Sequence, residues 1–306
     1  MLRYILHRVF MLAPVLFGVT LVAFFLLHLV PGDPAEILAG QEATKEDVDR
    51  IRVEYGLDKP LAVQYVRFVV SAAQGDLGIS IQSRHPVREL LFQRLTFTLQ
   101  LSLASILVAS AIGLLAGIVS STRQYSIFDT ASMLGALFGI SMPIFWLGLL
   151  LILVFAVKLH WLPSGGTGGL RYLILPAIAL GSASAAVIAR MTRASMLEVT
   201  RQDYIRTARA TGYRESVVIF RHGLKNAMIP VLTVFGLEFG TMLGGAVLTE
   251  TVFALPGIGR LLVEGIFARD YPVVQGAMVA VATTFVLVNL LTDVAYAFFD
   301  PRIRYE

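Results

Sequence analysis

Long apolar blocks are the feature that most constrains how this chain can fold. A helix that crosses a bilayer needs about 20 mostly apolar residues, and soluble helices rarely maintain such runs. Hydrophobic residues make up 56% of the 306 residues and charged residues only 15%, too little polar surface to cover the core of a soluble domain of this length. The blocks span 10–30, 97–119, 130–157, 173–189, 227–248 and 274–299. We therefore predict an all-α membrane protein with six transmembrane helices.

The first block lies where a secretion signal would lie, but it is too long. The apolar region of a signal spans about 7–15 residues and ends in a small-residue cleavage site. Here the run from Phe10 to Val30 leads into the sequence PGDP. We expect a retained anchor helix and a polar, partly helical extracytoplasmic segment within 1–95, followed by the membrane core in 96–306.

Lys and Arg are unevenly distributed over the predicted loops. The N-terminus, the second loop, the fourth loop and the C-terminal tail hold 13 of the 25 Lys and Arg, whereas the two short loops on the other side hold four. Short-loop positive charge marks the cytoplasmic side. We expect a multi-pass inner-membrane protein in the lipid bilayer with both termini in the cytoplasm, and its net charge of +4 does not indicate a nucleic-acid partner.

The fourth loop carries the most informative sequence. From Thr200 it reads TRQDYIRTARATGYRESVVIFRHGLKNAMIPV. Thr200 and Asp203 have the spacing of a capping box, and Gly212 is suited to end a helix in the left-handed conformation. A second short helix is expected from about Glu215 to His222. The pattern predicts a compact basic knob of two short helices, with an irregular solvated basic loop as the alternative.

This loop resembles the cytoplasmic coupling motif of binding-protein-dependent ABC importer permeases. In the branch that imports peptides, nickel and glutathione, the motif resembles Y-x-R-T-A-R-A-x-G followed by H-x-L-R-N-A-x-x-P. The matching residues here are Tyr204, Arg206, Thr207, Ala208, Arg209, Ala210 and Gly212, then His222, Leu224, Lys225, Asn226, Ala227 and Pro230. The more general form of the motif, E-A-A, Gly and I-x-L-P, is only partly present, because its Glu, its first Ala and its final Pro are missing.

The resemblance extends over the whole chain, and it is to the B-type subunit of dipeptide permeases in particular. Further matching stretches are LVPGDP at 29–34, LDKPLAVQY at 57–65, GDLGIS at 75–80, ISMPIFWLG at 140–148, GGAVLTETVFALPGIGRLL at 244–262, RDYPVVQG at 269–276 and DPRIR at 300–304. The resemblance implies an N-terminal anchor helix plus a five-helix type I importer permease core, with a coupling loop at about 194–226.

It also implies partners. The short helix near 204–212 would sit in a cleft of an ATP-hydrolysing subunit, two of which would bind ATP and Mg²⁺ on the cytoplasmic side. A second homologous permease would complete the pathway, and an extracytoplasmic solute-binding protein would deliver the cargo. Di- or oligopeptides are the expected cargo, with nickel or glutathione as alternatives.

No sequence motif in the chain indicates a catalytic activity of its own. It has no P-loop, no H-E-x-x-H, no G-x-S-x-G and no cysteine, and its histidines are scattered over different segments. A transport subunit without catalytic residues, metal or cofactor is therefore expected, with ATP hydrolysis supplied by partners.

Two acids lie inside predicted spans, Glu238 and Asp293. Ionisable groups at membrane depth are costly and mark functional positions by default. Glu238 is the candidate pathway residue, facing substrate or carrying protons, and a hydrogen bond between helices is the alternative for both acids. Glu238 also motivates a rival function, a proton-coupled secondary transporter, although the chain lacks the internal repeat typical of that class.

Small residues recur at helical spacing in three spans. Gly236, Gly240 and Gly244 do so in the fifth, and similar pairs occur in the second and fourth. Such faces allow close helix packing in lipid, and they would also permit sliding during transport. Prolines 143, 176 and 230 are expected to bend or begin helices.

The predicted outer loop at 250–273 is rich in aromatic, Pro and Gly residues. Phe253, Pro256, Gly257 and Gly259 are candidates for contact with the binding protein, because the resemblance places such loops there. A loop that dips back into the membrane is the alternative.

Overall fold

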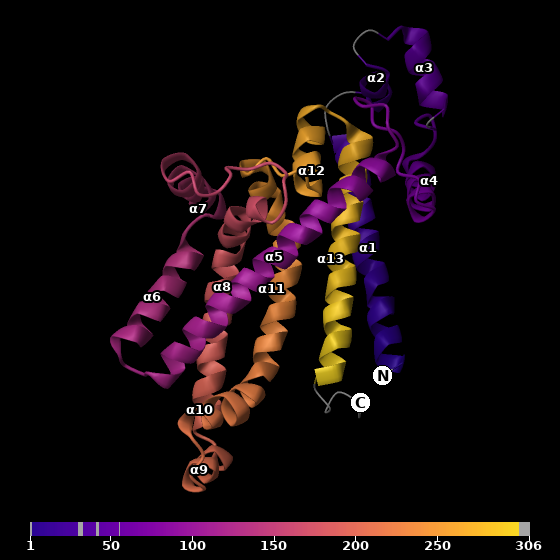
Figure 1. The fold of residues 1–306 in the computed structure, drawn as a ribbon. Coiled ribbons are helices and arrows are strands. Elements are labelled where there is room, and N and C mark those ends of the chain that lie inside the picture. The colour runs from indigo at the N-terminus through magenta and orange to yellow at the C-terminus, as the bar shows by residue number, and fades with distance from the viewer. Residues whose placement is uncertain (1, 30–32, 41–42, 55, 300–306) are drawn as a thin grey trace.

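The fold is built from long helices. The computed structural model describes residues 2–29, 33–40, 43–54 and 56–299, with side chains from 10 to 25 and, except for a few near 34–54, from 33 to 292. The long helices are α1 (Leu2–Leu29), α5 (Val87–Thr122), α8 (Arg171–Thr200), α11 (Lys225–Val252) and α13 (Tyr271–Phe299). Figure 1 shows them running between two ends of the molecule, here named the α9 end and the α3 end after the helices that lie farthest out. Within the described residues the fold is all-α, apart from one isolated bridge between Ile79 and Pro86.

The helices long and apolar enough to span a membrane are fewer than the predicted six. Within the described residues, four meet both criteria: 87–122, 171–200, 215–252 and 271–292. A fifth is added if α6 (Ile127–Ser141) and the helix that follows it count as one span. In α1, the apolar stretch with described side chains is only Phe10–Phe25. The structure therefore supports a bundle of four or five spans, and the sixth stays a prediction.

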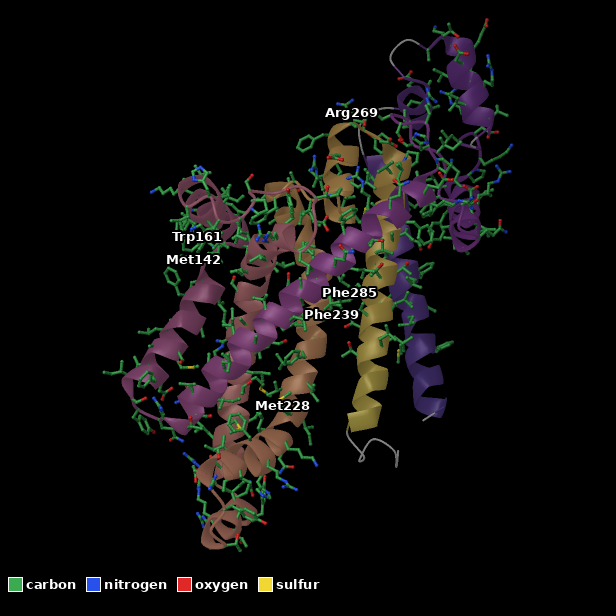
Figure 2. All side chains as sticks on the ribbon, viewed as in Figure 1. Met142, Trp161, Met228, Phe239, Arg269 and Phe285 are labelled. Carbon is green, nitrogen blue, oxygen red and sulfur yellow. The ribbon has the colours of Figure 1, made fainter. Side chains whose placement is uncertain are left out.

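The predicted span over 130–157 is broken at Pro143, where the sequence predicted a bend or the start of a helix. α6 ends at Ser141, and α7 (Ile144–Leu151) continues as a π-helical stretch to Lys158, at an angle of 106° to α6. Met142 is extended, with φ −81° and ψ 128°, because the ring of Pro143 disfavours the helical conformation in the preceding residue. Figure 2 shows Met142 at the end of α6, where the chain turns.

Close packing of small residues joins α5 to α8, as the sequence predicted. A Cβ placed at Gly113 would lie 2.7 Å from the carbonyl oxygen of Ala185, and one at Gly181 would lie 2.7 Å from that of Ser105. The two backbones thus approach closely, which compensates for the weak hydrophobic drive between helices in lipid. Beside this contact lies the main apolar cluster, which includes Leu101, Leu175, Ile188, Val231 and Met242.

The predicted glycines of α11 have different environments. Gly236 and Gly240 face α13, where an added Cβ would meet Thr292 and Asn289 respectively, whereas Gly244 has no neighbour within 4 Å. Figure 2 shows Phe239 and Phe285 between these two helices. Packing therefore accounts for two of the three glycines.

The short helices of the N-terminal segment lie at the α3 end (Figure 1). They are α2 (Pro34–Ala39), α3 (Lys45–Glu54) and α4 (Leu61–Ala73). α4 packs against α1 through Tyr65 and Phe68, whose rings lie 5.5 and 6.2 Å from that of Phe24. α5 then runs without a break across residues 95 and 96, so the predicted boundary between the two parts falls inside a helix, and the division itself stays a prediction.

Candidate functional site: the α9 loop and two buried carboxylates

The loop that resembles a coupling motif forms a separate short helix. α9 (Asp203–Ala210) lies at the far end of the molecule (Figure 1), directly after α8. Gly212 has a φ of +84°, so it ends α9 in the left-handed conformation predicted for it. A glycine suits this position because other residues adopt that conformation only with strain.

Two local predictions for this loop are wrong. Thr200 does not cap α9, because it is the last residue of α8 and its hydroxyl donates to the carbonyl of Leu197 at 3.2 Å. The second short helix is not separate either. α10 (Glu215–Val217) and a π-helical stretch (Val218–Leu224) run directly into α11, so one continuous helical segment leads from the knob into the membrane bundle.

The inner face of α9 is buried against its own chain. Ile205 and Ala208 pack with Val218 and Val199 in a small apolar cluster. The hydroxyl of Tyr204 accepts a hydrogen bond from the amide of Asn226 at 3.0 Å. Ala208, predicted to contact a partner, therefore supports the position of α9 from inside, and α9 is attached to both α8 and α11.

The outer face of α9 is exposed and basic. Arg206, Thr207, Arg209, Ala210 and Gly212 are all exposed. The Arg209 guanidinium donates to the Glu215 carboxylate at 2.7 and 3.2 Å, and this hydrogen bond, with the opposite charge, raises the pKa of Arg209. The pair closes the loop across Gly212.

A buried carboxylate lies near this end, and the sequence did not single it out. Asp129, in the first turn of α6, binds Nε and Nη2 of Arg193 on α8, each at 3.0 Å. It also accepts from the hydroxyl of Ser120 and from the backbone N–H of Tyr125. We call these four residues the Asp129 cluster. The available signal was Ser126 as an N-cap residue before an apolar helix, and in the structure its hydroxyl accepts from the backbone N–H of Asp129 at 3.2 Å.

A second buried carboxylate lies toward the α3 end. Glu250 on α11 is fully buried; one oxygen accepts from the Thr98 hydroxyl at 2.6 Å and the other from the backbone N–H of Arg260 at 3.0 Å. Thr98 in turn accepts from the N–H of Ile258 at 2.9 Å. These four residues, the Glu250 cluster, attach the start of α12 (Ile258–Phe267) to α5 and α11.

The residues predicted to meet a binding protein surround the Glu250 cluster. Phe253, Gly257 and Gly259 are buried within the chain, and Pro256 is half-buried. A Cβ at Gly257 would lie 2.0 Å from the Glu250 carboxyl carbon, so this glycine makes room for the carboxylate. The contact with a binding protein stays a prediction.

Glu238 makes a contact between helices. It is half-buried, and its carboxylate accepts a hydrogen bond from Ser184 on α8. The side chain of Asp293 lies outside the described residues. Among the described side chains, no group of three or more His, Asp and Glu could hold a metal ion.

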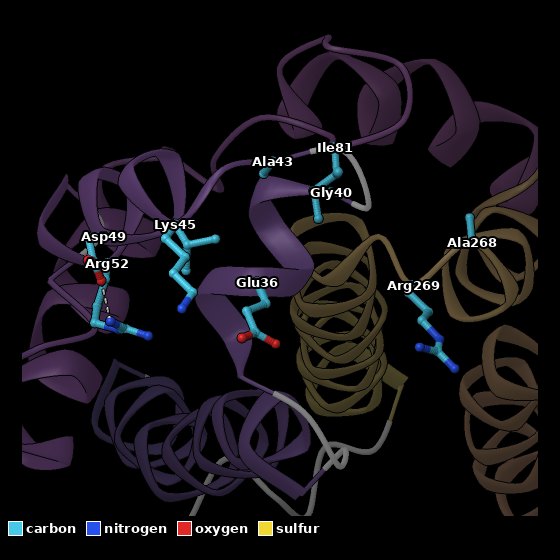
Figure 3. A pocket seen from close by; sticks show the side chains of 10 residues that line it. Glu36, Gly40, Ala43, Lys45, Asp49, Arg52, Ile81, Ala268 and Arg269 are labelled. Atoms are coloured by element: carbon cyan, nitrogen blue, oxygen red, sulfur yellow. Dashed lines mark hydrogen bonds and ion pairs between the residues drawn. The ribbon is translucent and has the colours of Figure 1, made fainter.

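A pocket of about 750 Å³ lies at the α3 end, away from these residues (Figure 3). Both signs of charge line it, from Glu36, Lys45, Asp49, Arg52 and Arg269. None of the site residues predicted from the sequence contributes to its lining.

Comparisons with known proteins agree over the full length of the chain. The family described as "binding-protein-dependent transport system inner membrane component" matches residues 109–305, and the N-terminal family of such membrane components matches 1–103. The dipeptide transport system permease protein DppB of Alkalihalophilus pseudofirmus is 46% identical over 333 residues, covering 100% of both chains. The glutathione transport system permease protein GsiC of Escherichia coli (strain K12) is 46% identical over 306 residues, again covering 100% of both.

Solved structures show the same fold at low identity. A chain of the MetNI methionine ABC transporter in inward-facing form superposes with a TM-score of 0.59 at 21% identity, covering 69% of this chain and 96% of the other. A chain of an amino acid ABC transporter gives 0.52 at 15% identity, covering 70% and 94%. This chain belongs to the family of binding-protein-dependent transport system inner membrane components.

Proposed function

We propose that this chain is one permease subunit of an ATP-driven importer and forms half of the pathway for di- or oligopeptides. The full-length relatives are named as dipeptide, di/tripeptide and glutathione permeases, so glutathione, itself a small peptide, is the first alternative cargo and nickel the second. The observation that carries the mechanical part is α9, which has an exposed basic outer face and is attached to two long helices.

The coupling role follows from how α9 is held. It follows α8 after two residues, and it packs on the segment that continues into α11. A push on α9 would therefore reach both helices, because only two residues join α9 to α8 and its apolar face packs on Val199 and Val218. Arg206, exposed on the outer face, is suited to pair with acidic groups of an ATPase subunit, because arginine forms strong charge-assisted hydrogen bonds with carboxylates. Closure of two ATPase subunits around ATP and Mg²⁺ would then rock two permeases between inward- and outward-open states.

The orientation follows from charge. The α9 end carries the basic loop, and α1 begins and α13 ends at the same end (Figure 1). Positive loops face the cytoplasm, so we assign both termini and α9 to the cytoplasmic side of the inner membrane. α2–α4 and α12 would then face the extracytoplasmic side, where the solute-binding protein docks, and a second homologous permease would complete the pathway.

A proton-coupled transporter has weaker support. Its candidate residue, Glu238, has a hydrogen-bond partner on α8, and the relatives are named as components of dipeptide and glutathione transport systems. The Ser184 contact is equally compatible with a structural role for this acid.

The test is reconstitution of the complete importer in proteoliposomes with its binding protein. Arg206→Glu and Ala210→Trp alter only the exposed outer face of α9, and we expect both to abolish co-purification of the ATPase subunits and ATP-driven uptake of a labelled dipeptide. Lys59→Glu makes the same charge change at the α3 end and serves as the control, with normal uptake expected. Normal uptake by both α9 variants would remove the coupling role.

The class of transporter is tested separately. Vesicles that contain this chain alone should not accumulate dipeptide in response to a pH gradient. If they do, the importer proposal is wrong. Competition of the labelled dipeptide by glutathione or Ni²⁺ in the complete importer decides the cargo.

A further inference from the structure

The Asp129 cluster joins three parts of the chain at one carboxylate. The Asp129 side chain is only 8% exposed, and it binds Arg193 on α8 through both oxygens. Ser120 contributes from the last turns of α5, and Tyr125 from the turn between α5 and α6. A bidentate arginine–carboxylate pair fixes orientation as well as distance, so α6 is held to α8 in a defined position.

Arg193 lies close to the point where α9 acts on α8. It is seven residues before Thr200, the last residue of α8, which corresponds to about 10 Å along a helix with a rise of about 1.5 Å per residue. No break in α8 separates the two positions. A displacement of α9 therefore reaches Arg193 through two turns of rigid helix.

The rest of the contact between α6 and α8 has no directional bond. Ala136 packs with Ala186 and Ala189, and a Cβ at Gly139 would lie 3.0 Å from the carbonyl oxygen of Ser182. Contacts of Ala and Gly hold the two helices close together, but they contain no hydrogen bond that fixes one helix along the other. Among the described side chains, Asp129–Arg193 is the only hydrogen-bonded pair between these helices.

We propose that the Asp129–Arg193 pair is the joint through which α8 moves α6. This inference rests on the proposed function, because it needs α9 to be driven by an ATPase subunit. Without the joint, α8 moves along the small-residue face of α6, and ATP hydrolysis proceeds without moving α6. Asp129 and Arg193 are positioning residues in this scheme, since they act through α6 and not on the cargo.

The first experiment measures dipeptide taken up per ATP hydrolysed by the complete importer in proteoliposomes. Asp129→Asn and Arg193→Gln should retain ATP hydrolysis and lower uptake per ATP by about fivefold or more. Arg193→Lys keeps the charge and should recover part of the loss. Arg190→Gln removes an exposed arginine one turn earlier on α8 and is the matched control, with unchanged uptake per ATP.

A second experiment replaces the joint by a different bond. The chain contains no cysteine, and a Cβ at Gly139 would lie 3.8 Å from the Cβ of Ala186, which suits a disulfide. In the Asp129→Asn background, Gly139→Cys with Ala186→Cys should restore uptake per ATP when oxidised and lose it again in dithiothreitol. The single Cys variants control for the substitutions.

The outcomes separate the joint from the proposed function. The joint is overturned if the wild-type importer shows ATP-driven uptake and Asp129→Asn and Arg193→Gln have the same uptake per ATP, or lose uptake and hydrolysis in proportion. It is also overturned if the oxidised disulfide does not rescue coupling. Absence of ATP-driven uptake in the wild type, with its ATPase subunits bound, contradicts the proposed function instead.

Discussion

Asp129 and Glu250 are both buried acids in helices of the bundle, but they are stabilised in opposite ways. Asp129 has a full positive charge opposite it, in the guanidinium of Arg193 at 3.0 Å. Glu250 has a hydroxyl and a backbone N–H, from Thr98 and Arg260. The first arrangement joins two helices that could each exist without it. The second determines the path of the chain between α11 and α12.

The difference indicates which of the two contacts costs more free energy to break. In the ion pair, the Arg193 side chain is 29% exposed, so water can solvate its guanidinium, and a carboxylate that loses it keeps two other hydrogen bonds, from Ser120 and Tyr125. Water has no comparable access to the Glu250 cluster, since Glu250 is fully buried and Thr98 is 4% exposed. Its loss leaves unpaired polar groups inside the chain, which is the costlier outcome. We therefore expect the Glu250 cluster to stay fixed during transport, and the Asp129 cluster to transmit the movement of α8 to α6.

The largest effect should come from filling the space that Glu250 occupies. Gly257→Val places a Cβ 2.0 Å from the Glu250 carboxyl carbon and must expel the carboxylate, at a cost of about 4 kcal/mol or more. We expect no monodisperse protein after detergent extraction, measured by size-exclusion chromatography. Gly244→Ala is the control, because a Cβ added at this position would have no neighbouring atom within 4 Å. Normal recovery of Gly257→Val would show that the Glu250 cluster is dispensable.

Removing the Glu250 carboxylate without a clash should cost somewhat less. Glu250→Ala leaves the N–H of Arg260 and the hydroxyl of Thr98 without their acceptor, about 3 kcal/mol in the free energy of unfolding. Glu250→Gln retains one acceptor oxygen and should cost about half as much. Thermal unfolding of the purified variants compares their stabilities. An equal loss of stability in both variants would mean that the acceptor oxygens of Glu250 do not stabilise the fold.

The same measurement on the Asp129 cluster should give a smaller loss. Arg193→Gln leaves Asp129 with its bonds from Ser120 and Tyr125, so we expect about 1 kcal/mol of destabilisation, below the roughly 3–5 kcal/mol that leaving a buried charge uncompensated costs. Arg190→Gln should change nothing measurable. If Arg193→Gln lowered the free energy of unfolding as much as Glu250→Ala does, the contrast between the two clusters would be wrong.

The smallest effect is expected at an acid exposed to water. The backbone N–H of Ala35 and the guanidinium of Arg52 lower the pKa of Asp33 at the start of α2. A lowered pKa in the folded state contributes stability at pH values above the ordinary pKa of about 4, and this stability is lost as the pH falls through the lowered value.

Hydrogen exchange in 34–54 measures this effect. Protection should be greater in the wild type than in Asp33→Asn at pH 7, and the difference should shrink as the pH falls below the ordinary pKa of about 4. Asp58→Asn, which removes the partner of Lys59 instead, should leave exchange in 34–54 unchanged over the same pH range. A difference between wild type and Asp33→Asn that does not shrink as the pH falls below about 4 would contradict a role for the carboxylate charge.

The end of α9 and the α5–α8 contact could be predicted because their signals are local, whereas the cap at Thr200 and the separate second helix were predicted wrongly. The turn at Gly212 needs only a residue that tolerates positive φ, and the Gly113 and Gly181 contacts need only small residues at helical spacing. The direction of Ala208 could not be predicted in the same way. A motif shows which residues recur together, but whether a given side chain faces a partner or its own chain depends on the helices packed beside it.

The bend after α6 shows the limit of hydropathy. Apolar content runs on through Pro143, so a criterion based on length and composition reads one span. Pro143 was expected to bend or begin a helix, yet an angle of 106° depends on how α7 packs against α8 and α11. The chain is apolar on both sides of the bend, so composition does not reveal the angle between the two helices.

The sequence by itself determined that the chain is helical, that it belongs in a membrane, and which loop resembles a coupling motif, because each of these depends on the composition or order of neighbouring residues. Only the tertiary structure decided which acids are buried and with whom. Asp129 and Arg193 are 64 positions apart, and Thr98 and Glu250 are 152 apart. Such pairs form because helix packing brings together turns that are distant in the sequence, and no local sequence pattern indicates which turns will meet.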